Sequence, residues 1–127
     1  MHDLTFVVGE DSAVAEIWET LGAAGIQMEA SCTVPRLEGR VVHAVVKDSD
    51  AEAAYEALRA AHFIPLDRRD VLIAEFVARP GAIGEITRKI ADAGAKLYIL
   101  FMATGDRVVI GASDLDKVAG VLQVSRD

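Results

Sequence analysis

The sequence predicts an α+β fold of two similar units, each with the order strand, helix, strand, strand, helix, strand. Three observations support this prediction. The chain repeats itself at a shift of 69 positions, its apolar residues recur at helical spacing in some stretches and alternate in others, and 52% of its 127 residues are hydrophobic. Such a composition excludes a disordered chain, because it supplies enough apolar surface to bury a core.

Composition and charge exclude further classes. The apolar runs are far shorter than the roughly 18 residues that span a bilayer, so no membrane segment is expected. Residues 1–3 lack the basic and apolar stretches of a secretory signal, and one cysteine, Cys32, forms no internal disulfide. We therefore expect a cytoplasmic protein. A net charge of −7 argues against nucleic acid as a partner.

The repeat defines the expected domains. Residues 11–34 align with residues 80–103 without a gap, and the identical pairs include Ala13 with Ala82, Ile17 with Ile86 and Gly25 with Gly94. Repeats of this kind are read before single elements, because they dictate the architecture. We predict a first unit over residues 1–69 and a second over residues 70–127, with the last strand of the second short or missing.

The first unit begins with a strand over residues 3–8. Val14, Ile17 and Leu21 predict a helix that Gly25 ends, and strict alternation predicts a strand over residues 26–34. A turn at Glu38-Gly39 leads into a strand over 40–47, and Ser49 to Glu52 is a capping box for a helix to residue 61. Residues 62–66 are predicted to form a fourth strand, with Pro65 favouring a sheet edge.

The second unit repeats this order. Strands are predicted over residues 71–77, 95–103 and 107–111, with helices over 81–93 and from Ser113 onward. Strand-helix-strand-strand-helix-strand units are ferredoxin-like, with an antiparallel sheet and both helices on one face. We expect the two sheets to pair side by side.

The segment Arg79-Pro80-Gly81 indicates an anion site at a helix start. Pro80 suits the first helical position, because its missing N–H is unpaired there in any residue. Gly81 has no Cβ, so a ligand can approach the backbone amides, which together with the positive end of the helix dipole attract a carboxylate. Arg79 would add a charge-assisted hydrogen bond.

Residues 79–86, continued by Ala93 to Leu97, resemble the ACT domain, a small regulatory module that senses amino acids. The resemblance covers the whole chain as a tandem pair, similar to small free-standing tandem ACT proteins. It implies ligand contacts from both copies. The implied residues are Arg79, Pro80, Gly81, Ala82, Ile83, Lys96 and Leu97 in the second copy, and Asp11, Ser12, Gln27 and Met28 in the first.

Two positions depart from the family pattern. Ala78 stands where the family often has Asp, and Lys96 where it commonly has Asn. Because a lysine ammonium repels the amine of an amino acid, we expect the second copy either to favour an anion without a free amine, such as a keto acid, or to hold no ligand. Gln27 keeps a carboxamide in the first copy, so a composite site is the alternative.

Charge and patterning distinguish the copies. Residues 1–69 carry 6 basic and 12 acidic side chains, and residues 70–127 carry 7 and 8, so the second copy is the better host for an anion. Its strand also alternates Tyr98, Leu100 and Met102 on the face that should meet water. We expect another subunit to cover that face in a homodimer.

The function expected from these features is that of a regulatory sensor of a small amino acid or related carboxylate, without catalytic activity or cofactor. A structural module that binds only a protein partner is the main alternative, and the fold leaves a small enzyme open. His2, His43 and His62 share no ligand spacing with Cys32, so no metal site is expected.

Overall fold

The computed structural model describes residues 1–126 and divides the chain into two compact units, Met1–Arg69 and the residues from Asp70 onward. Each unit combines one antiparallel sheet with two helices. The fold class is α+β with two ferredoxin-like units, as the sequence predicts. The arrangement of the two sheets side by side stays a prediction.

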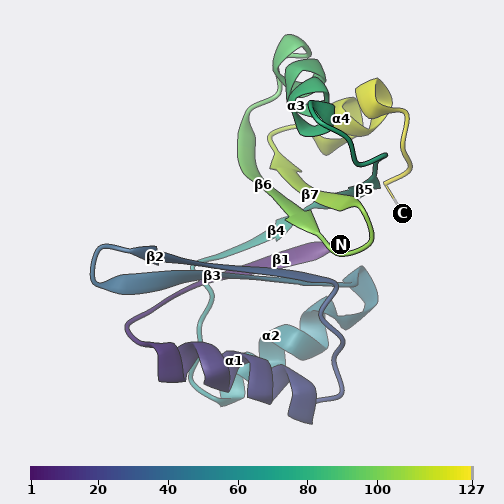
Figure 1. The fold of residues 1–127 in the computed structure, drawn as a ribbon. Coiled ribbons are helices and arrows are strands. Elements are labelled where there is room, and N and C mark those ends of the chain that lie inside the picture. The colour runs from purple at the N-terminus through teal and green to yellow at the C-terminus, as the bar shows by residue number, and fades with distance from the viewer. Residues whose placement is uncertain (127) are drawn as a thin grey trace. The chain divides into compact units, whose positions relative to one another are not determined.

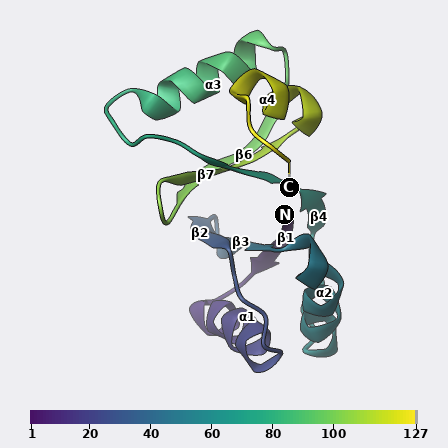
Figure 2. The same cartoon turned by 90° about the vertical axis from the view of Figure 1, so that its right-hand side faces the viewer.

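The first unit has a four-stranded sheet in the order β2-β3-β1-β4. β3 pairs antiparallel with both β1 and β2, and α1 and α2 lie on the same face of the sheet (Figures 1 and 2). The elements are β1 (His2–Val8), α1 (Asp11–Ala23), β2 (Ala30–Arg36), β3 (Gly39–Val46), the 3₁₀ turn η1 (Asp48–Asp50), α2 (Ala51–Ala60) and β4 (Asp67–Asp70).

Alternation along the strands builds the core of the first unit. Leu4 and Phe6 of β1 point toward the helices, where they meet Ile17 of α1 and Leu58 of α2, all at most 1% exposed. Residues between them in sequence, such as Thr5, therefore lie on the opposite face, because successive strand side chains alternate. We call this opposite face the open face.

The second unit has a three-stranded antiparallel sheet in the order β5-β7-β6. Its core joins strand residues such as Leu72 and Ile110 to Ile90 of α3 and Val118 of α4. No strand follows α4 within residues 1–126. The elements are β5 (Leu72–Glu75), α3 (Ala82–Asp92), β6 (Leu97–Ala103), β7 (Arg107–Ala112) and α4 (Leu115–Leu122).

The strand predicted over residues 62–66 is wrong. His62 takes the left-handed conformation at φ 70°, and the N–H of Phe63 donates to the carbonyl of Leu58 at 2.8 Å, so this segment closes α2. Pro65 has no N–H to donate. Only the N–H of Leu66 reaches the sheet, at 2.7 Å from the Thr5 carbonyl, and β4 begins one residue later.

Two other boundaries differ from the prediction for similar reasons. The N–H of Ile26 donates to Leu21 at the end of α1, so β2 begins only at Ala30. The hairpin turn is Leu37-Glu38, where Leu37 has φ 52°. The capping box predicted at Ser49 is also shifted, because Asp50 is the N-cap of α2 and does not cap it with its side chain. The N-cap of α4 is Asp114, whose side chain accepts from the N–H of Lys117 at 3.1 Å.

The predicted face of Tyr98, Leu100 and Met102 is interrupted by a β-bulge. The register of β6 against β7 shifts between Leu97 and Ile99, so Tyr98 is the extra residue. Beyond the shift Leu100 lies opposite Ile110 and packs against the core below the helices. Tyr98 and Met102 remain 51% and 59% exposed. Tyr98 therefore does not share a face with Leu100 and Met102, because a one-residue insertion reverses the alternation.

Candidate functional site

The start of α3 differs from the geometry expected from the sequence. Gly81, not Pro80, is the residue next to the helix, and it has φ 87°, in the left-handed region that glycine tolerates best. Pro80 therefore lies before the N-cap, and its predicted first helical position is wrong. The glycine supplies the conformation that turns the exposed segment into α3.

The first turn of α3 has backbone donors without a cap. The Ala82 N–H donates to the Arg79 carbonyl at 3.1 Å, and the Glu85 N–H to the Gly81 carbonyl at 3.0 Å. The N–H groups of Ile83 and Gly84, between these two donors, are the ones that normally donate to the side chain of an N-cap residue. Gly81 has no side chain to accept these hydrogen bonds. These two amides are the group that an added carboxylate would satisfy.

Arg79 is held by an internal carboxylate. Its guanidinium pairs with Glu85 in the first turn of α3 and also donates to the Pro80 carbonyl at 3.4 Å. This hydrogen bond from Arg79 lowers the pKa of the Glu85 carboxyl from its ordinary value. A ligand carboxylate would therefore compete with Glu85 for Arg79, a contact that the sequence did not indicate.

A hollow of about 350 Å³ runs along α3 from its first turn. It is lined by Ile83, Gly84, Thr87, Arg88 and Ala91, which recur at helical spacing on one side of the helix. Arg88 lies 3.7 Å from Asp92, an exposed pair one turn apart. The hollow thus extends from the two residues with uncapped amides to a cationic side chain.

The remaining predicted residues of the second unit lie at the start of α3 and at the start of β6. Ala82 is 7% exposed and Ile83 packs partly on the core. Lys96 pairs through its backbone with Ser113, whose Oγ accepts the Lys96 N–H at 2.9 Å, and its side chain is exposed. Leu97, the first residue of β6, is 38% exposed. No hydrogen bond or ion pair in residues 1–126 joins Lys96 to the Gly81 segment.

The predicted residues of the first unit lie on two separate segments. Asp11 begins α1 and its carboxylate pairs with Arg40 at 2.9 Å, while Ser12 is exposed in the same turn. Gln27 donates its amide to the Met28 carbonyl at 3.1 Å, and the Met28 side chain packs on the core. No hydrogen bond within residues 1–126 joins the two segments.

A polar cluster on the open face of the first sheet was missed from the sequence. The Thr5 hydroxyl donates to Asp3 Oδ2 at 2.7 Å, and His43 Nδ1 lies 3.0 Å from the same oxygen. Asp3 is fully buried, and its Oδ1 has no hydrogen-bond partner among residues 1–126. The sequence contained a signal for this cluster, because Asp3 and Thr5 are the two polar residues within the apolar run of residues 3–8.

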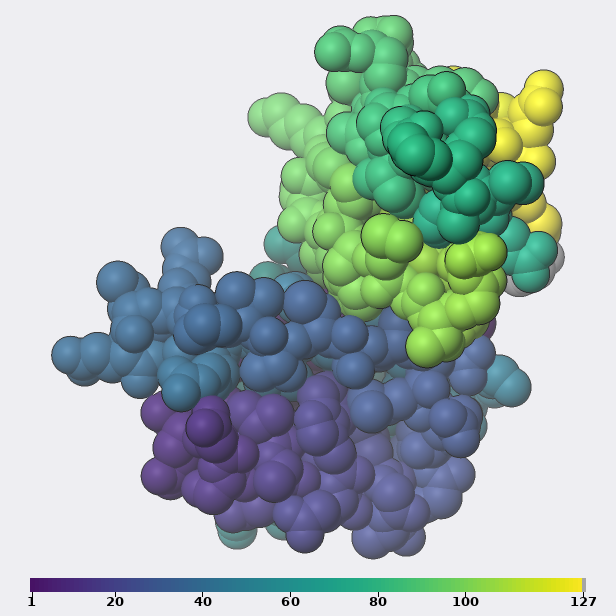
Figure 3. Space-filling view, in the orientation of Figure 1, coloured from purple at the N-terminus to yellow at the C-terminus, as the bar shows by residue number. Residues whose placement is uncertain are grey.

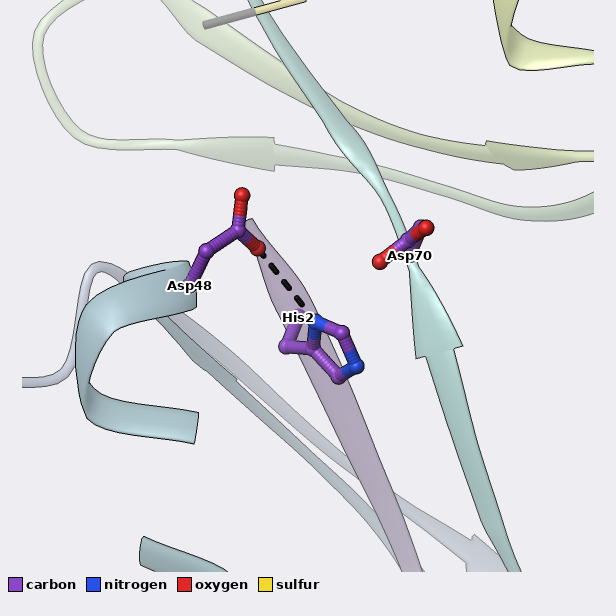
Figure 4. Close-up of side chains that lie close together, drawn as sticks. All are labelled: His2, Asp48 and Asp70. Carbon is purple, nitrogen blue, oxygen red and sulfur yellow. Dashed lines mark hydrogen bonds and ion pairs between the residues drawn. The ribbon is translucent and has the colours of Figure 1, made fainter. Parts of the chain in front are cut away.

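The end of β1 carries an exposed charge pair. His2 Nδ1 lies 3.3 Å from Asp48 Oδ1 (Figure 4), and the Met1 ammonium lies 2.9 Å from the same atom. The hydrogen bond from the Met1 ammonium, aided by His2, lowers the pKa of Asp48. Exposed pairs of this kind contribute little to stability.

None of the helices in residues 1–126 combines the length and apolar character that a membrane crossing requires.

Comparisons with known proteins show similarity at the level of structure. No protein-family model matches the chain, and no curated protein does. A solved protein of Bacteroides thetaiotaomicron superimposes with a TM-score of 0.81 at 25% identity, over 96% of this chain and 85% of that one.

Two further structures come from aspartate kinases. The ligand-free regulatory subunit from Thermus thermophilus has a TM-score of 0.71 at 18% identity, over 97% of this chain and 89% of that chain. The regulatory subunit from Thermus flavus has a TM-score of 0.62 at 18% identity, with coverage of 96% and 91%. The chain has an ACT-like fold. At these identities the similarity concerns the fold, and the ligand has to be argued from the residues of this chain.

Proposed function

We propose that this protein is a non-catalytic regulatory module, a tandem pair of ACT-like units that binds a small amino acid or related carboxylate at the start of α3. The observation that carries the proposal is the glycine N-cap, which leaves the amides of Ile83 and Gly84 uncapped. α4 shows the contrast, because Asp114 caps it with a side-chain carboxylate. A ligand carboxylate would occupy the place that the Asp114 carboxylate takes in α4.

The surroundings favour an anion. Arg79 precedes the first turn of α3, Arg88 lies in the second turn, and the hollow along the helix offers space for a side chain. Lys96, if it approaches the bound ligand, favours a 2-keto acid over an amino acid, because its ammonium repels an amine. Asp11, Ser12, Gln27 and Met28 would complete a composite site in the alternative arrangement.

Binding would act through competition within the first turn. Glu85 holds Arg79 in the free protein, and a ligand carboxylate at the amides would draw the guanidinium away. The ligand shifts the regulated state only by the difference in its affinity for the two arrangements. Regulatory subunits of aspartate kinase share the fold, which supports a regulatory role of this kind.

Calorimetric titration of the full chain with a panel of amino acids and 2-keto acids tests the proposal. We expect at least one ligand to bind, and Gly81→Asp to abolish that binding, since its carboxylate would place a negative charge beside the same amides and repel the carboxylate of the ligand. Arg79→Gln should weaken binding about tenfold, as expected for loss of a charge-assisted hydrogen bond. Arg59→Gln is the matched control, because it removes an exposed cation on α2.

The sensor proposal would be refuted if no member of the panel gave a heat of binding while circular dichroism showed an intact fold. Undiminished binding by Gly81→Asp would instead show that the ligand binds away from the start of α3.

The second candidate function is that of a module that binds only a partner chain. The apolar edge strand β6 favours it, because the exposed Tyr98 and Met102 suit pairing with a second copy. A homodimer through β6 is part of that proposal.

A further inference from the structure

The open face of the first sheet carries an ordered set of side chains. Cross-strand partners place them in successive rows, because β3 pairs with β1 on one side and β2 on the other. One row is polar, the next is apolar, and the last lies beside the hairpin turn. The rows are Thr5, His43 and Cys32, then Val7, Val41 and Val34, then Gly39 and Arg36.

Five residues of these rows line a hollow of about 540 Å³ together with Leu37 and Leu66. Its wall includes Thr5 and His43, Val7 and Val41, and Arg36, with Leu66 at the side. The volume lies within the range of small-molecule sites, roughly 300–1,000 Å³. All of the lining residues belong to the first unit, so the hollow is distinct from the start of α3.

The apolar row is unusually exposed. Val7 and Val34 are 58% and 48% exposed, Leu66 is 68% exposed, and Leu37 at the hairpin turn is 99% exposed. In Figure 3 the hairpin of β2 and β3 projects beyond the body of the first unit. The open face of an antiparallel sheet is normally polar, so a cluster of this kind marks a binding surface.

The two ends of the hollow differ in chemistry. Arg36 lies at one end, and it makes no ion pair or side-chain hydrogen bond within residues 1–126, whereas its neighbour Arg40 is held by Asp11. At the other end Asp3 holds Thr5 and His43 through short hydrogen bonds. The Nδ1 contact to Asp3 fixes the orientation of the imidazole ring.

Spacing sets the length of a matching ligand. The polar row and the Arg36 row are four residues apart on β3, which is roughly 13 Å at the rise of a strand, with the valine row midway. A bound molecule therefore needs an anionic group at one end and an apolar body behind it. Arginine favours a carboxylate, which it can bind through two parallel hydrogen bonds.

We propose that this hollow is a second ligand site, which binds an aliphatic carboxylate. The carboxylate pairs with Arg36, and the alkyl chain runs over Val7 and Val41 toward Thr5. The lining of this site does not include Ile83 or Gly84, so the proposal can be tested independently of the proposed sensor function.

Backbone-amide NMR titration of the full chain tests the proposal, with hexanoate as the probe. Hexylamine and 1-hexanol serve as controls of equal chain length and different charge. We expect saturable shift changes at Thr5, Val7, Val41 and the Arg36-Leu37 segment with hexanoate, weaker ones with 1-hexanol, and the weakest with hexylamine. Arg36→Gln should weaken hexanoate binding about tenfold and leave 1-hexanol unchanged. Arg59→Gln is the matched control, since it removes an exposed cation on α2.

Val7→Ser gives an independent check on the apolar row. Val7 is more than half exposed, so the variant should fold. Its affinities for hexanoate and for 1-hexanol should fall by similar factors. Three results would overturn the proposal: no shift changes on the open face, equal changes with hexylamine, or changes confined to Ile83 and Gly84. Concentration-dependent shifts on this face without any ligand would also overturn it, since they would assign the face to a second copy of the chain.

Discussion

Gly81 and Gly84 lie three residues apart and face opposite conformational demands. Gly81 holds a left-handed φ of 87° at the N-cap of α3, whereas Gly84 lies inside the first turn of the helix. A Cβ added at either position meets nothing within 4 Å, so packing does not separate them. Only the backbone conformation does.

Alanine substitutions should therefore have opposite effects. Gly81→Ala is expected to destabilise the protein by about 1–2 kcal/mol, the cost of a left-handed conformation for a residue with a Cβ. Gly84→Ala should stabilise it by about 0.5–1 kcal/mol, because alanine loses less backbone entropy in a helix. Urea unfolding of both variants measures the difference. The same sign for both would contradict the conformation assigned to Gly81.

At the scale of the element, β6 decides which of its residues are available to a partner. The bulge at Tyr98 reverses the alternation, so Leu100 faces Ile110 in the core while Met102, near the strand end, stays exposed. β6 is also the edge of its sheet. An apolar edge strand is a surface that proteins commonly cover by pairing.

Substitution by aspartate separates folding from assembly along β6. Leu100→Asp should lower the unfolding midpoint sharply, because it places a charge against the core. Met102→Asp should leave the stability of the chain within about 0.5 kcal/mol, as for most surface changes, while dissociating a homodimer that uses β6. Thermal unfolding followed by circular dichroism measures the stability, and analytical ultracentrifugation measures the oligomeric state. A Met102→Asp protein that sediments as the wild type would exclude β6 as the interface.

At the scale of the whole molecule, the chain builds two separate cores. Leu58 belongs to the core of the first unit and Ile90 to that of the second, and both are at most 1% exposed. Small units bury a modest fraction of their surface, so each core depends strongly on its few large side chains.

Truncations should therefore act unit by unit. Leu58→Ala and Ile90→Ala are each expected to cost about 2–5 kcal/mol. Hydrogen exchange should accelerate mainly in residues 1–69 for Leu58→Ala and mainly beyond residue 70 for Ile90→Ala. The two variants serve as each other's control. Equal acceleration in both units would show one cooperative core instead of two.

Much of the fold was predictable because its signals are local. The spacing of Val14, Ile17 and Leu21 identifies α1, and the short apolar runs of β1 and β3 place those strands within a residue or two. Hydrophobic periodicity directly reflects which side of an element meets the core. The helix start at Gly81 was also identified, although with Pro80 in the wrong position.

By itself, the sequence determined two units of similar element order, their α+β class and a helix start near Gly81. Only the tertiary structure decided the left-handed Gly81, the bulge at Tyr98, the pairing of Arg79 with Glu85, and the rows of the open face. The physical reason is distance along the chain. Helical spacing and alternation are properties of neighbouring residues, whereas the rows that join Thr5 to His43 depend on the register between strands far apart in sequence.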